Sequence, residues 1–219
     1  MLKQLLARLT GGEPAADASR WVVLDVESSG LDAEHDRLLA IAATAVQVVG
    51  ADMPRVALAD SFEVVLRQDE RDTATPDKAN ILVHGIGVGA QRAGVPAGEA
   101  LRAFVDYIGT APLVAFHAHF DQTLIRRALK AQGLPPLANP WLDLAALAPV
   151  LWPDQRAHAL DEWMALFGIT CMQRHQAAAD TLATAELLQA LWPRVCRQIA
   201  APDFRAVAQL AAQRRWLPP

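Results

Sequence analysis

Apolar residues form short runs in the first half of the chain and helical repeats in the second. The runs at 21–24, 38–49 and 56–67 are joined by short polar links, so they predict three consecutive strands in an antiparallel meander. A polar stretch at 68–80 is expected to be a loop, and a compact apolar patch follows it at 81–87.

The second half changes to strand–helix–strand and then to helices. A helix at 97–109, a strand at 112–116, a helix at 121–131 and a brief strand at 140–143 are expected first. Four helices should follow, near 144–151, 159–167, 177–191 and 203–214. Pro193 is expected to end the helix that begins at 177. Together the two halves predict an α/β fold. Its mixed five-stranded sheet combines a three-strand antiparallel meander with two parallel strands and is flanked by helices.

The chain divides into three parts. Residues 1–20 are expected to form a leading helix, over 1–10, and a linker; 21–192 form the main domain; and 193–219 form a helical tail. With 219 residues, 53% hydrophobic content and a mean hydropathy of +0.15, the chain can bury a substantial core.

Charge and cysteine content narrow the functional classes. A net charge of −4 argues against a strongly basic nucleic-acid binder, although acidic metal ligands would themselves make the charge negative. Cys171 and Cys196 show no metal-finger spacing and are expected to be reduced core thiols. No apolar stretch reaches the roughly 18 residues of a membrane span, and the N-terminus is too interrupted for a signal peptide. We therefore expect a cytoplasmic protein with no membrane partner.

Two carboxylates end the first apolar run. Asp25 and Glu27 are two residues apart, so in a strand their side chains point the same way. Carboxylates held this close repel each other unless a proton or a cation lies between them. A hard divalent metal is one explanation, and a strand that simply ends in the polar turn 28–30 is the other.

Two later segments carry similar chemistry. Asp121 stands where a buried strand runs into a helix, with His117 and His119 beside it; a helix N-cap and structural histidines are the alternative explanations. Asp180 interrupts the small-residue face of an alanine-rich helix, and His175 precedes it by five residues. An imidazole suits a general base that activates water, and a helix cap is its alternative role.

These four carboxylates and one histidine all fall at element ends. No basic residue directly follows any of them in a way that suggests a simple salt bridge. Such a set fits two-metal phosphoryl chemistry.

The constellation resembles the DEDDh, or DnaQ-like, exonucleases, the family that includes the proofreading epsilon subunit of bacterial replicative polymerase, oligoribonuclease and RNase T. The family's first motif corresponds to residues 25–31, its second ends in Phe-Asp at 120–121, and its third is His175 followed after four residues by Asp180. Residues 83–86 also match a short motif that is common in the epsilon-like branch, which is the branch that this chain most resembles.

The resemblance spans about residues 21–192 and implies an RNase H-like fold. It implies that the four carboxylates hold two Mg²⁺ or Mn²⁺ ions and that His175 deprotonates the attacking water. The residues it implies for catalysis are His175, Asp25, Glu27, Asp121 and Asp180, the last four as metal ligands; those for substrate binding are Ser28, Ser29, Gly30, Leu31, His84 and His117. This chain departs from the family at Phe116-His117, where relatives usually carry His-Asn.

The function implied is a metal-dependent 3′→5′ exonuclease that acts on single-stranded nucleic acid, with DNA favoured, and releases nucleoside 5′-monophosphates. The alternatives are an RNA-directed exonuclease of the same family, a polymerase-associated accessory module with weak activity, and a carboxylate metalloprotein outside nuclease chemistry. The sequence leaves open the pathway (proofreading, repair or RNA turnover), any DNA polymerase partner and the oligomeric state.

Overall fold

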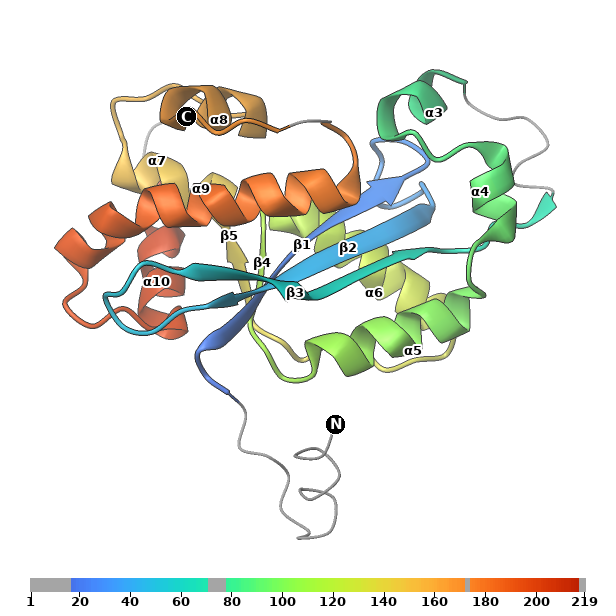
Figure 1. The fold of residues 1–219 in the computed structure, drawn as a ribbon, viewed down its shortest axis with the longest axis horizontal. Coiled ribbons are helices and arrows are strands. Elements are labelled where there is room, and N and C mark those ends of the chain that lie inside the picture. Colours follow the sequence, from blue (N-terminus) through green and yellow to red (C-terminus); the bar gives the residue numbers. More distant parts are fainter. Residues whose placement is uncertain (1–16, 71–77, 172–173, 217–219) are drawn as a thin grey trace, which may run out of the picture.

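A five-stranded mixed sheet forms the centre of the molecule (Figure 1). The computed structural model describes residues 17–70, 78–171 and 174–216, so the leading helix expected at 1–10 lies outside the described residues. The strands are β1 (Arg20–Ser28), β2 (Leu38–Gln47), β3 (Arg55–Val65), β4 (Leu113–Ala115) and β5 (Trp141–Asp143), in the spatial order β3-β2-β1-β4-β5. The first three pair antiparallel, and β4 and β5 run parallel to β1. The predicted fold is confirmed.

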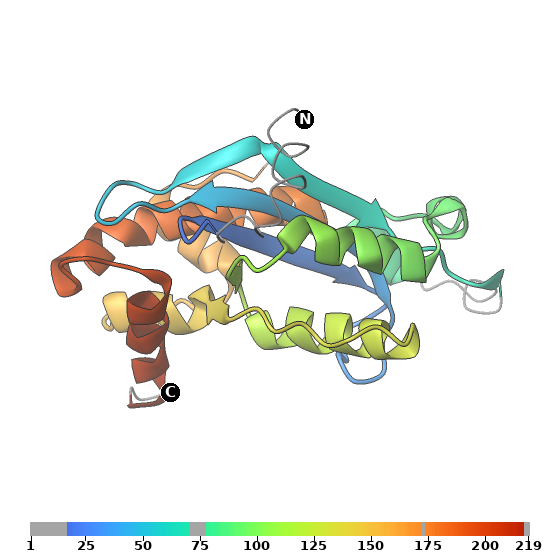
Figure 2. The same cartoon turned by 90° about the horizontal axis from the view of Figure 1, so that it is seen from below.

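Helices cover both faces of this sheet. They are α3 (Lys78–His84), α4 (Val88–Ala93), α5 (Ala97–Ile108), α6 (Ala118–Ala131), α7 (Leu144–Leu151), α8 (Leu160–Phe167), α9 (Ala177–Gln198) and α10 (Phe204–Ala211), followed by a 3₁₀ helix (Ala212–Trp216). Figure 2 shows α5 and α6 together on one face. The other face packs against α7, α8, α9 and α10.

The alternation of side chains along β1 decides which face each residue serves. Trp21 and Val23 belong to the core beneath α7–α10, whereas Val22 belongs to the core beneath α5 and α6. By the same alternation, Asp25 and Glu27 stand on the α9 face. The strand therefore carries both carboxylates toward the helix that bears Asp180.

Three element boundaries differ from the prediction. Helix α3 begins at Lys78, inside the expected loop, and α6 begins at Ala118, three residues early. The predicted helix end at Pro193 is wrong, because α9 continues to Gln198. Buried Trp192 and Val195 flank the proline, and their packing outweighs the roughly 3 kcal/mol that an interior proline costs. The division of the chain at residue 193 stays a prediction, although α9 runs across it.

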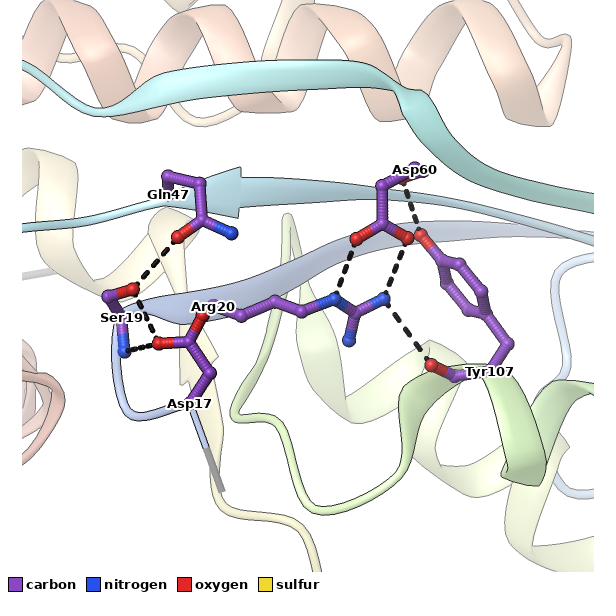
Figure 3. Close-up of polar contacts among 6 residues, drawn as sticks. All are labelled: Asp17, Ser19, Arg20, Gln47, Asp60 and Tyr107. Carbon is purple, nitrogen blue, oxygen red and sulfur yellow. Dashed lines mark hydrogen bonds and ion pairs between the residues drawn. The ribbon is translucent and has the colours of Figure 1, made fainter. Parts of the chain in front are cut away.

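A polar cluster fastens the end of the sheet that is remote from the carboxylates (Figure 3). The Arg20 guanidinium donates to both carboxylate oxygens of Asp60, at 2.8 and 3.0 Å, and the Tyr107 hydroxyl donates to the Asp60 carbonyl at 2.8 Å. The arginine lowers the pKa of Asp60, and burial raises the pKa of Tyr107 to about 12. The cluster ties the start of β1 to β3 and to the end of α5.

Two expectations about the whole chain concern membranes and thiols. Within the described ranges, no helix is long and apolar enough to span a bilayer. Cys171 and Cys196 are free thiols, as expected, but both are half-buried rather than enclosed in the core.

Candidate active site

Two acidic side chains lie at the carboxyl end of β1. Asp25 pairs across the sheet with Ala42, and Glu27 pairs with Ala40. Burial, followed by the nearby charge of Asp180, raises the pKa of Asp25 to about 8. Burial together with the charge of Asp25 raises the pKa of Glu27 to about 9. The Asp-x-Glu pair is therefore a crowded, poorly solvated charge pair and not the polar end of a strand.

Asp121 joins this pair from the first turn of α6. Its side chain is 4% exposed, and burial and the Asp25 charge raise its pKa well above the usual range. The N-cap explanation for Asp121 is wrong, because His117 holds the N-cap position. The His117 amide donates to Asp143 Oδ1 at 3.0 Å, which ties the start of α6 to the end of β5.

Asp180 approaches from the opposite side, on the first turn of α9. The residue is 5% exposed, and its carboxylate accepts a 3.0 Å hydrogen bond from the His175 amide. The next residue, Thr181, donates to the carbonyl of Ala42 at 3.2 Å, and Ala42 is the residue that pairs with Asp25. This bond and the small buried alanines of α9 seat Asp180 beside β1.

His175 and His117 share an unusual backbone conformation. They are the two non-glycine residues of the described ranges with positive φ, at 62° and 60°. This left-handed conformation is costly for a residue with a side chain, and it persists where the surroundings enforce it. Each histidine stands just before the helix that carries one of the buried aspartates, and each imidazole is exposed. The helix-cap explanation for His175 is wrong, since Gln176 is the N-cap of α9.

One cation in the cluster escaped the sequence analysis. Arg174 forms ion pairs with Asp161 of α8 and with Asp180 of α9. Its positive charge also offsets part of the rise in the pKa of Asp25 and of Glu27, although both pKa values stay raised. No basic residue directly follows these carboxylates in sequence to suggest a salt bridge, and the partner that the structure gives Asp180 comes from the preceding segment. Because arginine has a long side chain, Arg174 reaches Asp180 from six positions away.

The donor set matches a hard divalent cation in chemistry. All four side chains offer carboxylate oxygens, and Glu27 Oε1 is buried without a hydrogen-bond partner among the described residues. Across the described ranges, however, no three Asp, Glu, His or Cys side chains converge closely enough to coordinate one ion as they stand. Arg174 is paired with Asp180 in this arrangement, so Asp180 would have to exchange the guanidinium for a metal ion to act as a ligand.

The loop after β1 carries the predicted substrate-binding residues. Ser28 Oγ donates to the Gly30 carbonyl, and Ser29 Oγ donates to Asp36 Oδ1 at 2.9 Å. Leu31, at the tip, is 95% exposed. An exposed side chain of this size next to the carboxylates offers an apolar surface that a ligand could cover. The loop is thus internally fixed, with its one large apolar side chain turned to solvent.

Gly30 is required by the close approach of Asp36. A Cβ at position 30 would lie 2.5–2.8 Å from the Asp36 carboxylate, which is held by Ser29 and by the Asp32 amide. We expect Gly30→Ala to displace the loop and Leu31, and to raise the KM for an oligonucleotide about tenfold with a smaller change in kcat. Steady-state kinetics on single-stranded DNA test this. The control is Gly89→Ala, where the added methyl meets open space; equal effects of the two variants would contradict the steric argument.

The patch at 83–86 divides into a buried and an exposed part. His84 is 3% exposed, and its Nδ1 accepts a 2.9 Å hydrogen bond from the Ile86 amide. Burial lowers the pKa of His84, which keeps the ring neutral. The preceding Leu82 and Val83 are 85% and 51% exposed. His84, which the resemblance implies for substrate binding, is therefore buried. Among the residues of α3 whose exposure is described, Leu82 and Val83 are the exposed ones.

The remaining aromatic residues near the site are structural. Phe116 belongs to the α7–α10 core, and Phe120 packs against the core beneath α5 and α6. The rings of Phe116 and His117 meet edge to face, with centroids 4.7 Å apart.

A family model described as an exonuclease, RNase T, matches residues 22–188, which include all three acidic motifs. The chain belongs to this family, the DnaQ-like 3′→5′ exonucleases. Curated relatives include the PolC-type DNA polymerase III of Bacillus cereus, 32% identical over 168 residues, and that of Bacillus subtilis, 32% identical over 169. Each match covers 77% of this chain but only 11% of the polymerase.

Solved structures of DnaQ-like exonucleases share the fold. Exonuclease I of E. coli, in complex with a dT13 oligonucleotide, superposes with a TM-score of 0.69 and 20% identity, covering 82% of this chain and 42% of that one. A zinc-bound form of the same enzyme with single-stranded DNA gives a TM-score of 0.67 and 21% identity, covering 82% of this chain and 41% of that one. The mixed sheet and its helices are therefore those of the RNase H-like exonucleases.

Proposed function

We propose that this chain hydrolyses the terminal phosphodiester of single-stranded DNA from the 3′ end, releases nucleoside 5′-monophosphates and depends on divalent metal ions. The observation that carries the proposal is the approach of Asp25, Glu27, Asp121 and Asp180 from β1, α6 and α9, beside the exposed His175. Three poorly solvated carboxyl groups with raised pKa values, next to a fourth that is paired with Arg174, are costly to a fold unless they serve a cation.

Each side chain has a role in this proposal. The four carboxylates would hold two Mg²⁺ or Mn²⁺ ions, which when bound supply activation of water and charge stabilisation at the phosphate. His175 accepts the proton of the attacking water. The water oxygen attacks phosphorus, the bond to the 3′ oxygen of the neighbouring nucleotide breaks, and that oxygen takes up a proton from solvent. The shortened strand then ends in a new 3′-hydroxyl, and the released nucleotide carries the 5′-phosphate.

The loop and α3 would hold the terminal nucleotide. Leu31 offers an apolar face to a base, and contact of this kind tolerates any sequence. The backbone of residues 28–30 lies next to Asp25 and Glu27 and would position the terminal phosphate. His117 would take the place of the usual asparagine as a hydrogen-bonding group at the start of α6, and His84 would support the turn from within.

DNA as substrate, and a polymerase as partner, are supported by the relatives. Solved structures of exonuclease I include complexes with DNA oligonucleotides, and the curated relatives are PolC-type DNA polymerase III chains, of which this chain spans about a ninth. We propose a DNA substrate and an association with a DNA polymerase on this basis.

Digestion of a 5′-labelled single-stranded oligonucleotide tests the proposal. With Mg²⁺ or Mn²⁺ we expect a ladder that shortens from the 3′ end and disappears in EDTA, and a matched RNA should be degraded more slowly. Faster digestion of the RNA would reverse the substrate assignment. Absence of cleavage of both strands, with metal binding shown by calorimetry, would overturn the enzymatic role.

A further inference from the structure

A basic cavity lies at the same end of the sheet as the carboxylates, on the face that α5 and α6 cover. It has a volume of about 670 Å³ and opens between the start of β2, the end of β3 and the last turns of α6. Leu38, Leu66 and Leu124 are lining residues that belong to the buried core beneath α5 and α6. Since Leu38 pairs with Ser28 at the end of β1, the cavity and the loop after β1 lie at the same end of the sheet.

Cations line this cavity in a chain that is acidic overall. Arg37, Arg67, Arg127 and Lys130 contribute to its walls, with Asp36 as the acidic residue. The Asp36 carboxylate already accepts hydrogen bonds from Ser29 Oγ and from the Asp32 amide. The walls therefore have an excess of positive charge over an apolar floor.

Three of these cations have no acidic partner in the described part of the chain. Arg127 Nη1 donates to the carbonyls of Ala33 and Asp36, both at 2.7 Å, and Arg67 Nε donates to the carbonyl of Gly94 at 3.1 Å. Neither arginine nor Lys130 forms an ion pair there. Carbonyl oxygens orient a guanidinium but leave its charge uncompensated, so these groups attract an anion.

The cavity is joined to the catalytic loop. Asp36 lines the cavity and binds Ser29, while Arg127 fastens the same loop to α6. Along α6, Arg127 and Lys130 follow Asp121 by about 9 and 13 Å. At a stacked rise of about 3.4 Å per nucleotide, a strand with its 3′ end at Asp121 reaches the cavity after about three to four nucleotides.

We propose that this cavity binds a nucleoside phosphate, supplied by the upstream part of the strand whose 3′ end is cleaved. The cations take the phosphates, and the apolar floor takes sugar or base surface. The assignment to a strand rests on the proposed function, whereas the cavity's affinity for a nucleoside phosphate does not. The same chemistry could come from a free nucleoside monophosphate, which the experiment separates.

Binding in EDTA tests the proposal without hydrolysis. Fluorescence anisotropy of 5′-labelled dT4, dT8 and dT16 compares the wild type with the Arg67→Gln/Lys130→Gln variant. We expect dT16 to bind the variant about three- to tenfold more weakly, with the loss growing with length. For the variant, the slope of log K for dT16 binding against log salt concentration should be less steep by about 1.4, which corresponds to the loss of two phosphate contacts on a single strand. Arg156→Gln/Arg205→Gln is the matched control, since it removes two exposed charges from the α7–α8 loop and α10.

Several outcomes separate the possibilities. Unchanged dT16 affinity and salt slope, with retained thermal stability, would overturn the cavity as a binding site. If the Arg67→Gln/Lys130→Gln variant lost affinity only for dTMP, measured by calorimetry, the cavity would be a site for a free nucleoside phosphate and its assignment to the strand would be overturned. Length-dependent binding through Arg67 and Lys130 by a protein that cleaves no substrate would support the cavity and overturn the proposed function alone.

Discussion

Asp25→Asn is expected to lower the rate of exonucleolytic cleavage at least about 10³-fold while making the metal-free protein more stable at alkaline pH. Metal assistance in phosphoryl transfer is worth several kcal/mol, and each 1.4 kcal/mol is a factor of ten in rate. The amide keeps the shape of the side chain but loses the charge that would hold a cation. Initial rates on single-stranded DNA in Mg²⁺ measure the first effect.

The stability effect follows from the raised pKa of the same group. The pKa of Asp25 is about 8 in the folded protein, above its ordinary value of 3.8, so the folded state binds the proton more tightly than the unfolded chain. The free energy of unfolding carries no penalty from Asp25 below pH 4, and it falls as the pH rises toward 8. Asparagine cannot ionise, so the penalty disappears in the variant.

Thermal melts in EDTA distinguish this effect from general damage. At pH 8.5 we expect the Asp25→Asn variant to melt about 3 °C or more above the wild type, since about 1 kcal/mol gives a shift of this size in a chain of this length. The difference should shrink as the pH falls and vanish only near pH 4, at the ordinary pKa of an aspartate. Asp106→Asn, an exposed acid on α5, is the control and should change neither activity nor the pH dependence. A variant that melts lower at pH 8.5 would contradict the crowding of charge at Asp25.

The sheet and the acidic residues could be predicted because local patterns determine them. The run from Trp21 to Leu24 had to be buried on both faces, and the two-residue period of a strand fixed Asp25 and Glu27 on one side. The alanine-rich start of α9 likewise indicated close packing, which the Thr181 bond to Ala42 provides. These features depend on residues that are near one another in sequence or on a regular repeat.

Other parts of the site depend on contacts that no local pattern records. The pairing of Arg174 with Asp161 and Asp180 joins two helices, and nothing in the sequence around Arg174 distinguishes it from other surface arginines. The positive φ of His175 follows from the hydrogen bond that its amide makes to Asp180, five residues later. The lining of the basic cavity comes from four segments that are far apart in the sequence, so the net charge of the chain, which is acidic, does not reveal it.

His175→Ala carries the second large expected effect, a fall in kcat of about 10²–10⁴-fold with little change in KM. The backbone of His175 turns through a left-handed conformation, its amide binds Asp180, and its ring is left exposed beside the carboxylates. A ring in that position can accept the proton of a water that attacks the terminal phosphate. Because hydroxide at higher pH replaces part of that role, the deficit of the variant should shrink between pH 7 and pH 9.

Two other exposed histidines, His117 and His119, are alternative candidates for the general base, so variants of them test the assignment to His175. Both lie at the start of α6, at the same end of the sheet as Asp121. Single-turnover rates should fall far less in His119→Ala than in His175→Ala, and His158→Ala, remote on the α7–α8 loop, should match the wild type. If His175→Ala cleaves at the wild-type rate while the loss of His117 or His119 abolishes cleavage, the base comes from α6. The strained turn before α9 then serves only to hold Asp180 in place.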